Sequence, residues 1–182
     1  MIFNSNATGI FDRNKGKKVL RPTVRPETAP IDWLLEALAI LGTMILVGFA
    51  IYQYPRLPEI IPTHFNASGA VDDFSSRSTF LMLPAIGVFI YILLTLLALI
   101  PYQFNYSVKI TPANALKQYT FAIRLIRYMK TVLIWSFFYI SNATVNAAAN
   151  RDSGLGVWFL PIFFGFLFVP VIVYLIIAFK HR

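Results

Sequence analysis

Four long runs of apolar residues constrain this chain more than any other feature of its sequence. They cover residues 34–52, 80–100, 131–149 and 156–179, and the only charged residue in them is Glu36, near the start of the first run. A helix needs about 20 apolar residues to cross the ~30 Å hydrocarbon core of a bilayer, and each run is close to that length. Only 13% of the residues are charged, whereas soluble domains have about 25%. The sequence therefore predicts an integral membrane protein with four transmembrane segments.

The continuity of these runs predicts helices. In lipid every backbone N–H and C=O group needs a partner within the protein, so only helices and closed barrels span a bilayer. Barrel strands would alternate apolar and polar residues, and these runs do not. We expect an all-α integral membrane protein in which residues 32–182 form one four-helix membrane domain. Residues 1–31 are basic and contain three prolines, so we expect a mostly disordered cytoplasmic arm.

The distribution of basic residues predicts the orientation. Thirteen of the 16 Lys and Arg residues lie in the N-terminal tail, in the loop 101–130 and at the C-terminus. The positive-inside rule then places both termini in the cytoplasm and the loop between the first two spans outside. We expect the basic residues to lie near anionic lipid headgroups. The tail has no stacking residues clustered with its charges, so we expect no nucleic-acid partner.

The loop before the third span predicts an amphipathic cytoplasmic helix. Apolar residues recur at helical spacing, and basic residues fall on the opposite face. The basic face contains Lys117, Arg124 and Arg127. No glycine or proline lies between Ala113 and Ala149, so this helix could run directly into the third span. Two interpretations remain open here, a stabilising contact with the membrane surface and a docking site for a cytosolic partner.

The second half of the third span carries a polar face. Asn142 and Asn146 are four residues apart, and Tyr139 and Trp135 extend the same face. Amides are costly against lipid, so this face should point into the bundle or into a water-filled recess. The asparagines either bond helix to helix or line a ligand pocket.

The loop between the first two spans contains most of the polar residues that we expect outside the membrane. Asn66 and Gly69 supply turn chemistry. His64 has three interpretations: it holds the loop by hydrogen bonds, it contacts a receptor or senses pH, or it binds a metal with Asp72 or Asp73. One imidazole with carboxylates falls short of the usual zinc ligand set, so His64 is a weak metal candidate and we expect no metal site.

This loop resembles a known family. It reads Ile61-Pro62-Thr63-His64-Phe65-Asn66-Ala67-Ser68-Gly69-Ala70-Val71-Asp72. This is similar to a bacterial membrane domain of unknown function with an I-P-x-H-F-N-x-x-G-x-x-D segment, which also forms the front of SdpI-type immunity proteins. Residues 104–119 look like stand-alone members of the same group. The resemblance implies a multi-pass protein of the bacterial inner membrane, and a role in protection against a secreted peptide toxin and in sequestering a repressor.

These patterns favour a non-enzymatic function. The sequence has no cysteine, and we find no paired acids, metal set or phosphate-binding loop, so we expect neither enzymatic activity nor a cofactor. The leading hypothesis is a small accessory, immunity or signalling protein that binds a membrane-protein partner or joins a larger complex. The external loop would supply the contact residues Pro62, His64, Phe65, Asn66, Gly69 and Asp72. The alternative is a small transporter or ligand-binding protein that uses Tyr139, Asn142 and Asn146.

Overall fold

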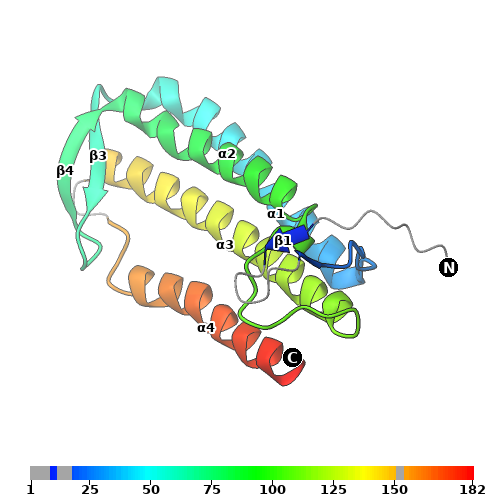
Figure 1. Ribbon diagram of the computed structural model, residues 1–182. Helices are drawn as coiled ribbons and strands as arrows, with labels where there is room; N and C mark the ends of the chain where they lie inside the picture. The colour runs from blue at the N-terminus through cyan, green and yellow to red at the C-terminus, as the bar shows by residue number, and fades with distance from the viewer. Residues whose placement is uncertain (1–8, 12–17, 151–153) are drawn as a thin grey trace.

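The computed structural model describes residues 9–11, 18–150 and 154–182, and four helices dominate it (Figure 1). They are α1 (Pro30–Gln53), α2 (Met82–Leu97), α3 (Ala115–Ala149) and α4 (Phe159–Lys180). Each is long and apolar enough to cross a membrane, if α2 is taken with the 3-10 turn η2 (Arg77–Leu81) that precedes it. The four predicted membrane-spanning helices are confirmed as four helices long and apolar enough to span, in a mostly helical structure. The predicted all-α class is too narrow, because two short pairs of strands accompany the helices.

The third helix is much longer than its apolar run. The predicted amphipathic segment is the first half of α3, and the helix continues without a break to Ala149. Asn114 precedes it: its side-chain oxygen accepts a hydrogen bond from Thr111 N at 2.8 Å, and its carbonyl accepts one from Gln118 N at 3.0 Å. Residues 115–130 therefore belong to the same rigid rod as the span itself.

Helices α1, α2 and α3 pack against one another and form a three-helix core. The buried seam of α1 includes Ala39, Gly42, Leu46 and Ala50, which recur every three or four residues. Small residues let the helices approach closely: a Cβ atom on Gly87 of α2 would lie only 2.7 Å from Leu46 Cδ2. Close approach matters in lipid because association there depends on van der Waals packing and polar contacts.

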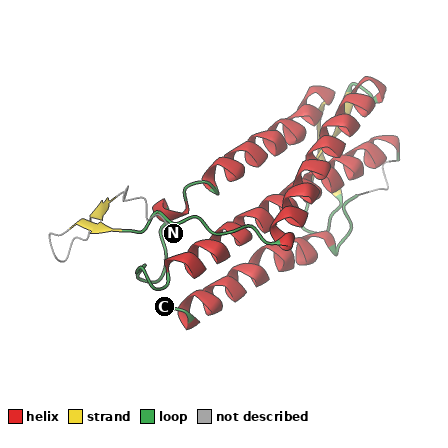
Figure 2. Ribbon diagram, turned by 90° about the vertical axis from the view of Figure 1, so that its right-hand side faces the viewer, coloured by secondary structure: helices red, strands yellow, loops and turns green. Residues whose placement is uncertain are grey.

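Helix α4 lies along α3, on the side away from α1 and α2 (Figures 1 and 2). It is displaced along the bundle axis relative to α3. At its start, the ring of Phe159 stacks on Tyr139 with centroids 5.2 Å apart. At its end, Gln118 Nε2 donates to Ala178 O at 2.9 Å and to His181 O at 3.2 Å. Residues 140–149 of α3 therefore extend beyond the beginning of α4.

The bundle has two distinct ends. The terminal end carries the start of α1, the start of α3 and the end of α4 (Figure 1). Residues 21–29 lie there as an extended segment, held where Arg21 Nη1 donates to Phe104 O at 2.6 Å and Tyr119 OH donates to Pro22 O at 3.1 Å. Before it, β1 (Gly9–Phe11) pairs with β2 (Lys18–Leu20), and both stand beyond the bundle in Figure 2. The described parts of the predicted disordered arm are thus extended, and the remainder lies outside the described residues.

The opposite end, the hairpin end, is covered by two antiparallel strands, β3 (Ile60–Phe65) and β4 (Val71–Ser76). They follow the short 3-10 turn η1 (Tyr54–Arg56) at the end of α1 and lead into η2 before α2. Figure 1 shows the strands lying across the end of the helices, so the first loop is an ordered hairpin.

Candidate functional site

The hairpin end carries the sequence motif and is the first candidate site. Ile60 pairs with Ser76 and Phe65 with Val71, and the register shifts on both sides of His64. Such irregularities change the direction in which side chains point. Strand β3 packs on the bundle, whereas most of β4 is exposed. Both strands therefore contribute to the accessible surface of the hairpin, with three exposed residues in β3 and four in β4.

The turn of the hairpin is built by Asn66 and Gly69. The Asn66 side-chain oxygen accepts hydrogen bonds from Ser68 N at 3.0 Å, Ser68 Oγ at 2.7 Å and Ala70 N at 3.1 Å. Gly69 has a φ of +79°, in the left-handed region that favours glycine. The predicted turn at Asn66 and Gly69 is confirmed, and the Asn66 side-chain oxygen accepts its hydrogen bonds from within the loop.

The hairpin is braced at its base and at its tip. At the base, Leu57 and Ile61 are buried against Ala50 of α1 and Phe80 of η2. At the tip, Leu155 N, in the connection between α3 and α4, donates to Gly69 O at 2.8 Å. A Cβ atom on Gly69 would lie 2.5 Å from Gly156 O, so only glycine allows this approach of the two backbones. The hairpin is therefore fixed relative to the helices at two separate points.

His64 and Asp72 form the polar centre of the exposed surface. His64 Nδ1 lies 2.5 Å from Asp72 Oδ1, and their side chains remain 65% and 41% exposed. Within the described residues no group of three or more His, Cys, Asp or Glu side chains is arranged to hold a metal ion. The contact favours the interpretation of His64 as a residue that joins the two strands, while most of its ring stays accessible.

The structure divides the six predicted contact residues of the loop. His64 and Asp72 are exposed, whereas Pro62 and Gly69 are buried. Phe65 and Asn66 are half-buried. Pro62 and Gly69 therefore position the hairpin and offer no side chain to a partner. Sequence reasoning missed two large apolar side chains that are accessible, Ile60 and Phe74, at 61% and 47% exposure. The spacing alone gave no signal for them, because their exposure depends on which strand covers the bundle.

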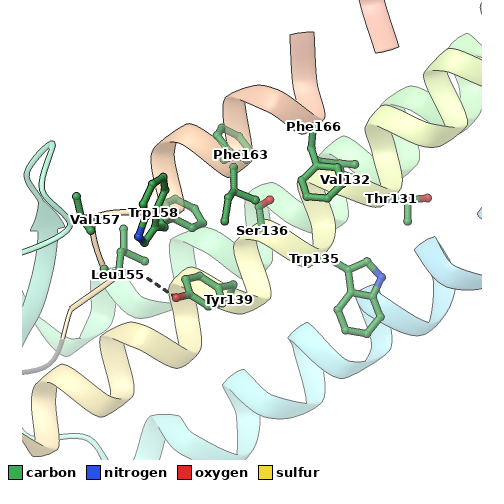
Figure 3. A pocket seen from close by; sticks show the side chains of 13 residues that line it. Thr131, Val132, Trp135, Ser136, Tyr139, Leu155, Val157, Trp158, Phe163 and Phe166 are labelled. Carbon is green, nitrogen blue, oxygen red and sulfur yellow. Dashed lines mark hydrogen bonds between the residues drawn. The ribbon is translucent and has the colours of Figure 1, made fainter. Parts of the chain in front are cut away.

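The predicted polar face of α3 is split by the position of α4. Tyr139 borders an apolar hollow of about 690 Å³ between α3 and α4, and its hydroxyl donates to Leu155 O at 2.9 Å (Figure 3). Trp135 points toward α1 in Figure 3, where its Nε1 donates to Leu38 O at 3.1 Å. Asn142 is half-buried and Asn146 is exposed, and neither borders this hollow. Of the two positions predicted for this face, inside the bundle or in a water-filled recess, the first does not hold for Asn146, because α4 begins level with Tyr139.

The predicted basic face of α3 is largely turned toward α1. Lys117 is exposed, but Arg124 and Arg127 are half-buried in ion pairs. Arg124 Nε and Nη2 lie 3.1 Å from the two carboxylate oxygens of Asp32, and Arg127 Nη1 lies 3.2 Å from Asp32 Oδ1. Asp32 also accepts a hydrogen bond from Ala29 N at 2.9 Å, at the first turn of α1. This carboxylate thus links the start of α1 to the middle of α3.

A second ion pair lies deeper in the three-helix core and was missed by sequence reasoning. Lys130 is only 1% exposed, and its Nζ donates to Glu36 Oε1 at 2.6 Å and to Thr95 Oγ1 at 2.8 Å. The Tyr91 hydroxyl donates to the same Glu36 oxygen at 3.1 Å, and Lys130 Nζ lies 4.5 Å from the centre of the Tyr91 ring. This cluster joins α1, α2 and α3.

We call the five charged residues of these contacts the ion-pair network; its members are Asp32, Glu36, Arg124, Arg127 and Lys130. Lys130 had been assigned to the loop because it is the last charged residue before the third apolar run. Ionisable groups inside a helical membrane bundle are costly unless they are paired, and they often mark functional positions. The ion-pair network is therefore a second candidate functional site of the molecule.

One comparison with known proteins includes the hairpin. A family model described as a domain of unknown function, DUF1648, matches residues 40–88, which run from the middle of α1 through the hairpin into α2. An uncharacterized protein of Archaeoglobus fulgidus is 40% identical over 52 residues, which make up 29% of this chain and 28% of that protein. No solved structure matches the chain. The predicted likeness to a domain of unknown function is confirmed for residues 40–88. The loop motif as a family hallmark and the link to SdpI-type immunity proteins stay predictions.

Proposed function

We propose that this chain is a small non-enzymatic accessory protein of the bacterial inner membrane whose hairpin recognises a partner outside the cytoplasm. The observation that carries the proposal is the double bracing of the hairpin through Ile61 at its base and Gly69 at its tip. A surface that is ordered before binding loses less conformational entropy when a partner docks. Loops held by a rigid scaffold are common positions for binding residues.

The chemistry of the exposed surface suits a protein or peptide partner. Ile60 and Phe74 offer apolar contact area, and the His64–Asp72 pair offers hydrogen-bonding groups beside them. Among the described residues β4 pairs only with β3, so an extended peptide could add a strand at its other edge. The resemblance to SdpI-type immunity proteins makes a secreted peptide toxin one candidate partner.

The proposal requires the hairpin to face outward. Both Pro30 and Lys180 lie at the terminal end, and the basic residues concentrate there, which supports an orientation with both termini inside. Because the chain has no cysteine, single cysteines can report the topology. Ala67→Cys in the hairpin turn should react with a membrane-impermeant maleimide on intact cells. Ala113→Cys, before α3, should react only after permeabilisation, and the reverse pattern would place the hairpin inside.

Co-purification tests the recognition role. The tagged protein is isolated from its native membrane in mild detergent, and its partners are quantified by mass spectrometry. We expect a stoichiometric partner that is lost when His64 and Asp72 are both changed to alanine. Asn66 should be left intact in this test because its hydrogen bonds build the turn. If Asn66 were changed, loss of the partner could come either from a lost contact or from an unfolded hairpin.

Lys117→Ala is the matched control, since Lys117 is exposed at the opposite end of the molecule. This variant should retain the partner. Hydrogen exchange across residues 60–76 should be the same in wild type and in the double variant, to show that the hairpin stays folded. Recovery of the protein alone, or retention of the partner by the double variant and by an Ile60→Ser/Phe74→Ser variant, would refute recognition through this surface.

The alternative is transport or ligand binding by the polar face of α3. Tyr139 borders the hollow of about 690 Å³ between α3 and α4, but Asn142 and Asn146 line none of the three hollows along that contact. We therefore favour recognition by the hairpin.

A further inference from the structure

Strand β4 has a backbone amide that faces away from β3. Phe74 lies directly opposite Pro62 in the ladder, and proline is placed in a sheet where its missing N–H removes no ladder bond. The backbone groups of such a pair point away from each other. The Phe74 N–H donates instead to Asp73 Oδ1 at 2.8 Å, within its own strand. An extended chain that pairs with β4 can take over this N–H.

Two accessible apolar side chains lie beside this amide. Ile60 is opposite Ser76, and Phe74 is opposite Pro62. Opposite residues share a face of the sheet, as do alternate residues of one strand. Ile60 and Phe74 are therefore diagonal neighbours on one face, and both are exposed. They provide apolar contact area next to the unpaired edge of β4.

The charge around this edge is negative, although the chain as a whole has a net charge of +8. Residues 57–76 contain Glu59, Asp72 and Asp73 but no lysine or arginine. All three carboxylates belong to exposed residues. Asp72 contacts His64, whereas Glu59 and Asp73 form no ion pair within the described residues. The hairpin thus presents negative charge that the protein does not balance.

The two arginines that flank the hairpin are engaged elsewhere. Arg56 donates to Tyr52 O, and its guanidinium lies 3.8 Å from the centre of the Tyr52 ring. Arg77 donates to Leu57 O at 3.4 Å and lies 5.6 Å from the centre of the Tyr54 ring. Both side chains contact the end of α1 and the residues that follow it. The acidic groups of the hairpin therefore stay available to a partner.

This charge decides between the possible occupants of the edge. A second copy of β4 would bring Asp72 and Asp73 against the same two residues, and like charges across a ladder are destabilising. Anionic lipid headgroups would be repelled for the same reason. Within the described residues no three acidic or histidine side chains are grouped to hold a metal ion. Charge complementarity favours a positively charged polypeptide segment.

We propose, building on the proposed function, that the hairpin binds its partner through an extended, positively charged peptide segment that pairs with β4. A carbonyl of the segment accepts the Phe74 N–H in place of Asp73 Oδ1. The released Asp73 carboxylate, together with Glu59 and Asp72, then pairs with lysine or arginine side chains of the segment. A neutral segment would leave Asp73 without its hydrogen bond and without a counter-charge. The edge therefore selects positively charged chains.

Three dye-labelled peptides of six residues, the length of β4, test this selectivity. Valine alternates with lysine in the first, with threonine in the second and with glutamate in the third. The protein is held in nanodiscs of phosphatidylcholine, which has no net charge, and binding is measured by fluorescence anisotropy. An exposed ion pair contributes about a factor of two to binding. With three such pairs, the lysine peptide should bind about tenfold more tightly than the threonine peptide, and the glutamate peptide should bind least.

A variant that changes charge but little else tests where the preference arises. Glu59→Gln/Asp73→Asn should reduce the preference for lysine over threonine to about twofold, the share of Asp72. Glu27→Gln is the control, because Glu27 is exposed at the terminal end, and it should keep the full preference. Hydrogen exchange across residues 60–76 of the free double variant should match the wild type, to show that the hairpin stays folded.

The backbone contact has its own measurement. The lysine peptide should slow hydrogen exchange of the Phe74 amide. Equal binding of the three peptides to the wild-type protein would overturn the proposal. So would an unchanged preference in Glu59→Gln/Asp73→Asn, or bound lysine peptide that leaves Phe74 exchange unaltered.

These results are separable from those that test the proposed function. The double variant keeps His64 and Asp72, whose replacement is the co-purification test. Loss of the native partner from the His64→Ala/Asp72→Ala variant, with equal binding of the three peptides, would keep recognition by the hairpin and refute the charged segment. Selective peptide binding by a protein that is always recovered alone would refute the stable partner and keep the preference of the edge.

Discussion

Replacing Lys130 with methionine should remove the cation that joins α1, α2 and α3. Lys130 Nζ contacts Glu36 Oε1 at 2.6 Å and Thr95 Oγ1 at 2.8 Å, and its side chain is almost fully buried. Loss of one member of a buried ion pair costs about 3–5 kcal/mol, because the other charge remains in a poorly solvated position. Glu36 keeps 24% of its side chain exposed, and Arg127 Nε lies 3.8 Å from Glu36 Oε2. We therefore expect the lower limit, about 3 kcal/mol.

A double variant distinguishes the effect of the ion pair on stability from the effect of the packing around it. Glu36→Gln/Lys130→Met removes both charges and keeps side chains of similar volume. Replacement of both members of a buried pair is often nearly neutral. The double variant should therefore be more stable than Lys130→Met by about 2 kcal/mol.

The free energy of unfolding can be measured by denaturing-detergent titration in mixed micelles, with helix content followed by circular dichroism. Lys117→Met is the control, because Lys117 is exposed on the same helix, and its effect should stay within about 0.5 kcal/mol. The reasoning is wrong if Lys130→Met unfolds like the control. It is also wrong if the double variant is no more stable than the single one.

Three further variants test individual contacts by hydrogen exchange. Asn66→Ala removes the acceptor of three hydrogen bonds and should speed exchange across residues 60–76 by about tenfold or more; unchanged exchange would contradict its role in the turn. Tyr139→Phe removes the bond to the α3–α4 connection and should speed exchange at residues 155–158 by less than about tenfold; an effect confined to other segments would count against it. Gln118→Leu removes both bonds to the end of α4 and should loosen its last turn, at a cost below about 1 kcal/mol in overall stability because it also removes a buried oxygen without a partner.

The four helices could be predicted from the sequence because the bilayer sets a length that an apolar run must meet. The turn at Asn66 and Gly69 could be predicted as well, because the residues that form it are close together in the sequence. The sequence does not predict how a helix is rotated or displaced against its neighbours when its surface is apolar on every side. The hydrophobic pattern of α4 has no polar side to orient it. The exposure of Asn146 depends on that displacement, and for this reason its position could not be decided from the sequence.

The pairing of Glu36 with Lys130 had a weak sequence signal. Glu36 is the single charge within the apolar runs, and Lys130 immediately precedes one of them. A charge at such a place needs a partner, but the partner lies 94 residues away in the chain. Only the packing of α1 on α3 reveals the pair. A charge at the boundary of a run is therefore better assigned to the helix than to the loop.

The contacts of α4 differ in kind from those of the other helices, and this bears on the proposed function. Helices α1, α2 and α3 are joined by an ion-pair network with hydrogen bonds from Thr95 and Tyr91. Helix α4 is bound to α3 mainly through Gln118 at one end and stacked aromatic rings at the other. In lipid there is no hydrophobic force to close the space between α3 and α4, because acyl chains are as apolar as the helices. The contacts at the start of α4 therefore matter most for its position on α3. Since the connection at Leu155 also bonds to the hairpin tip through Gly69, these contacts help to fix the surface that we propose to bind the partner.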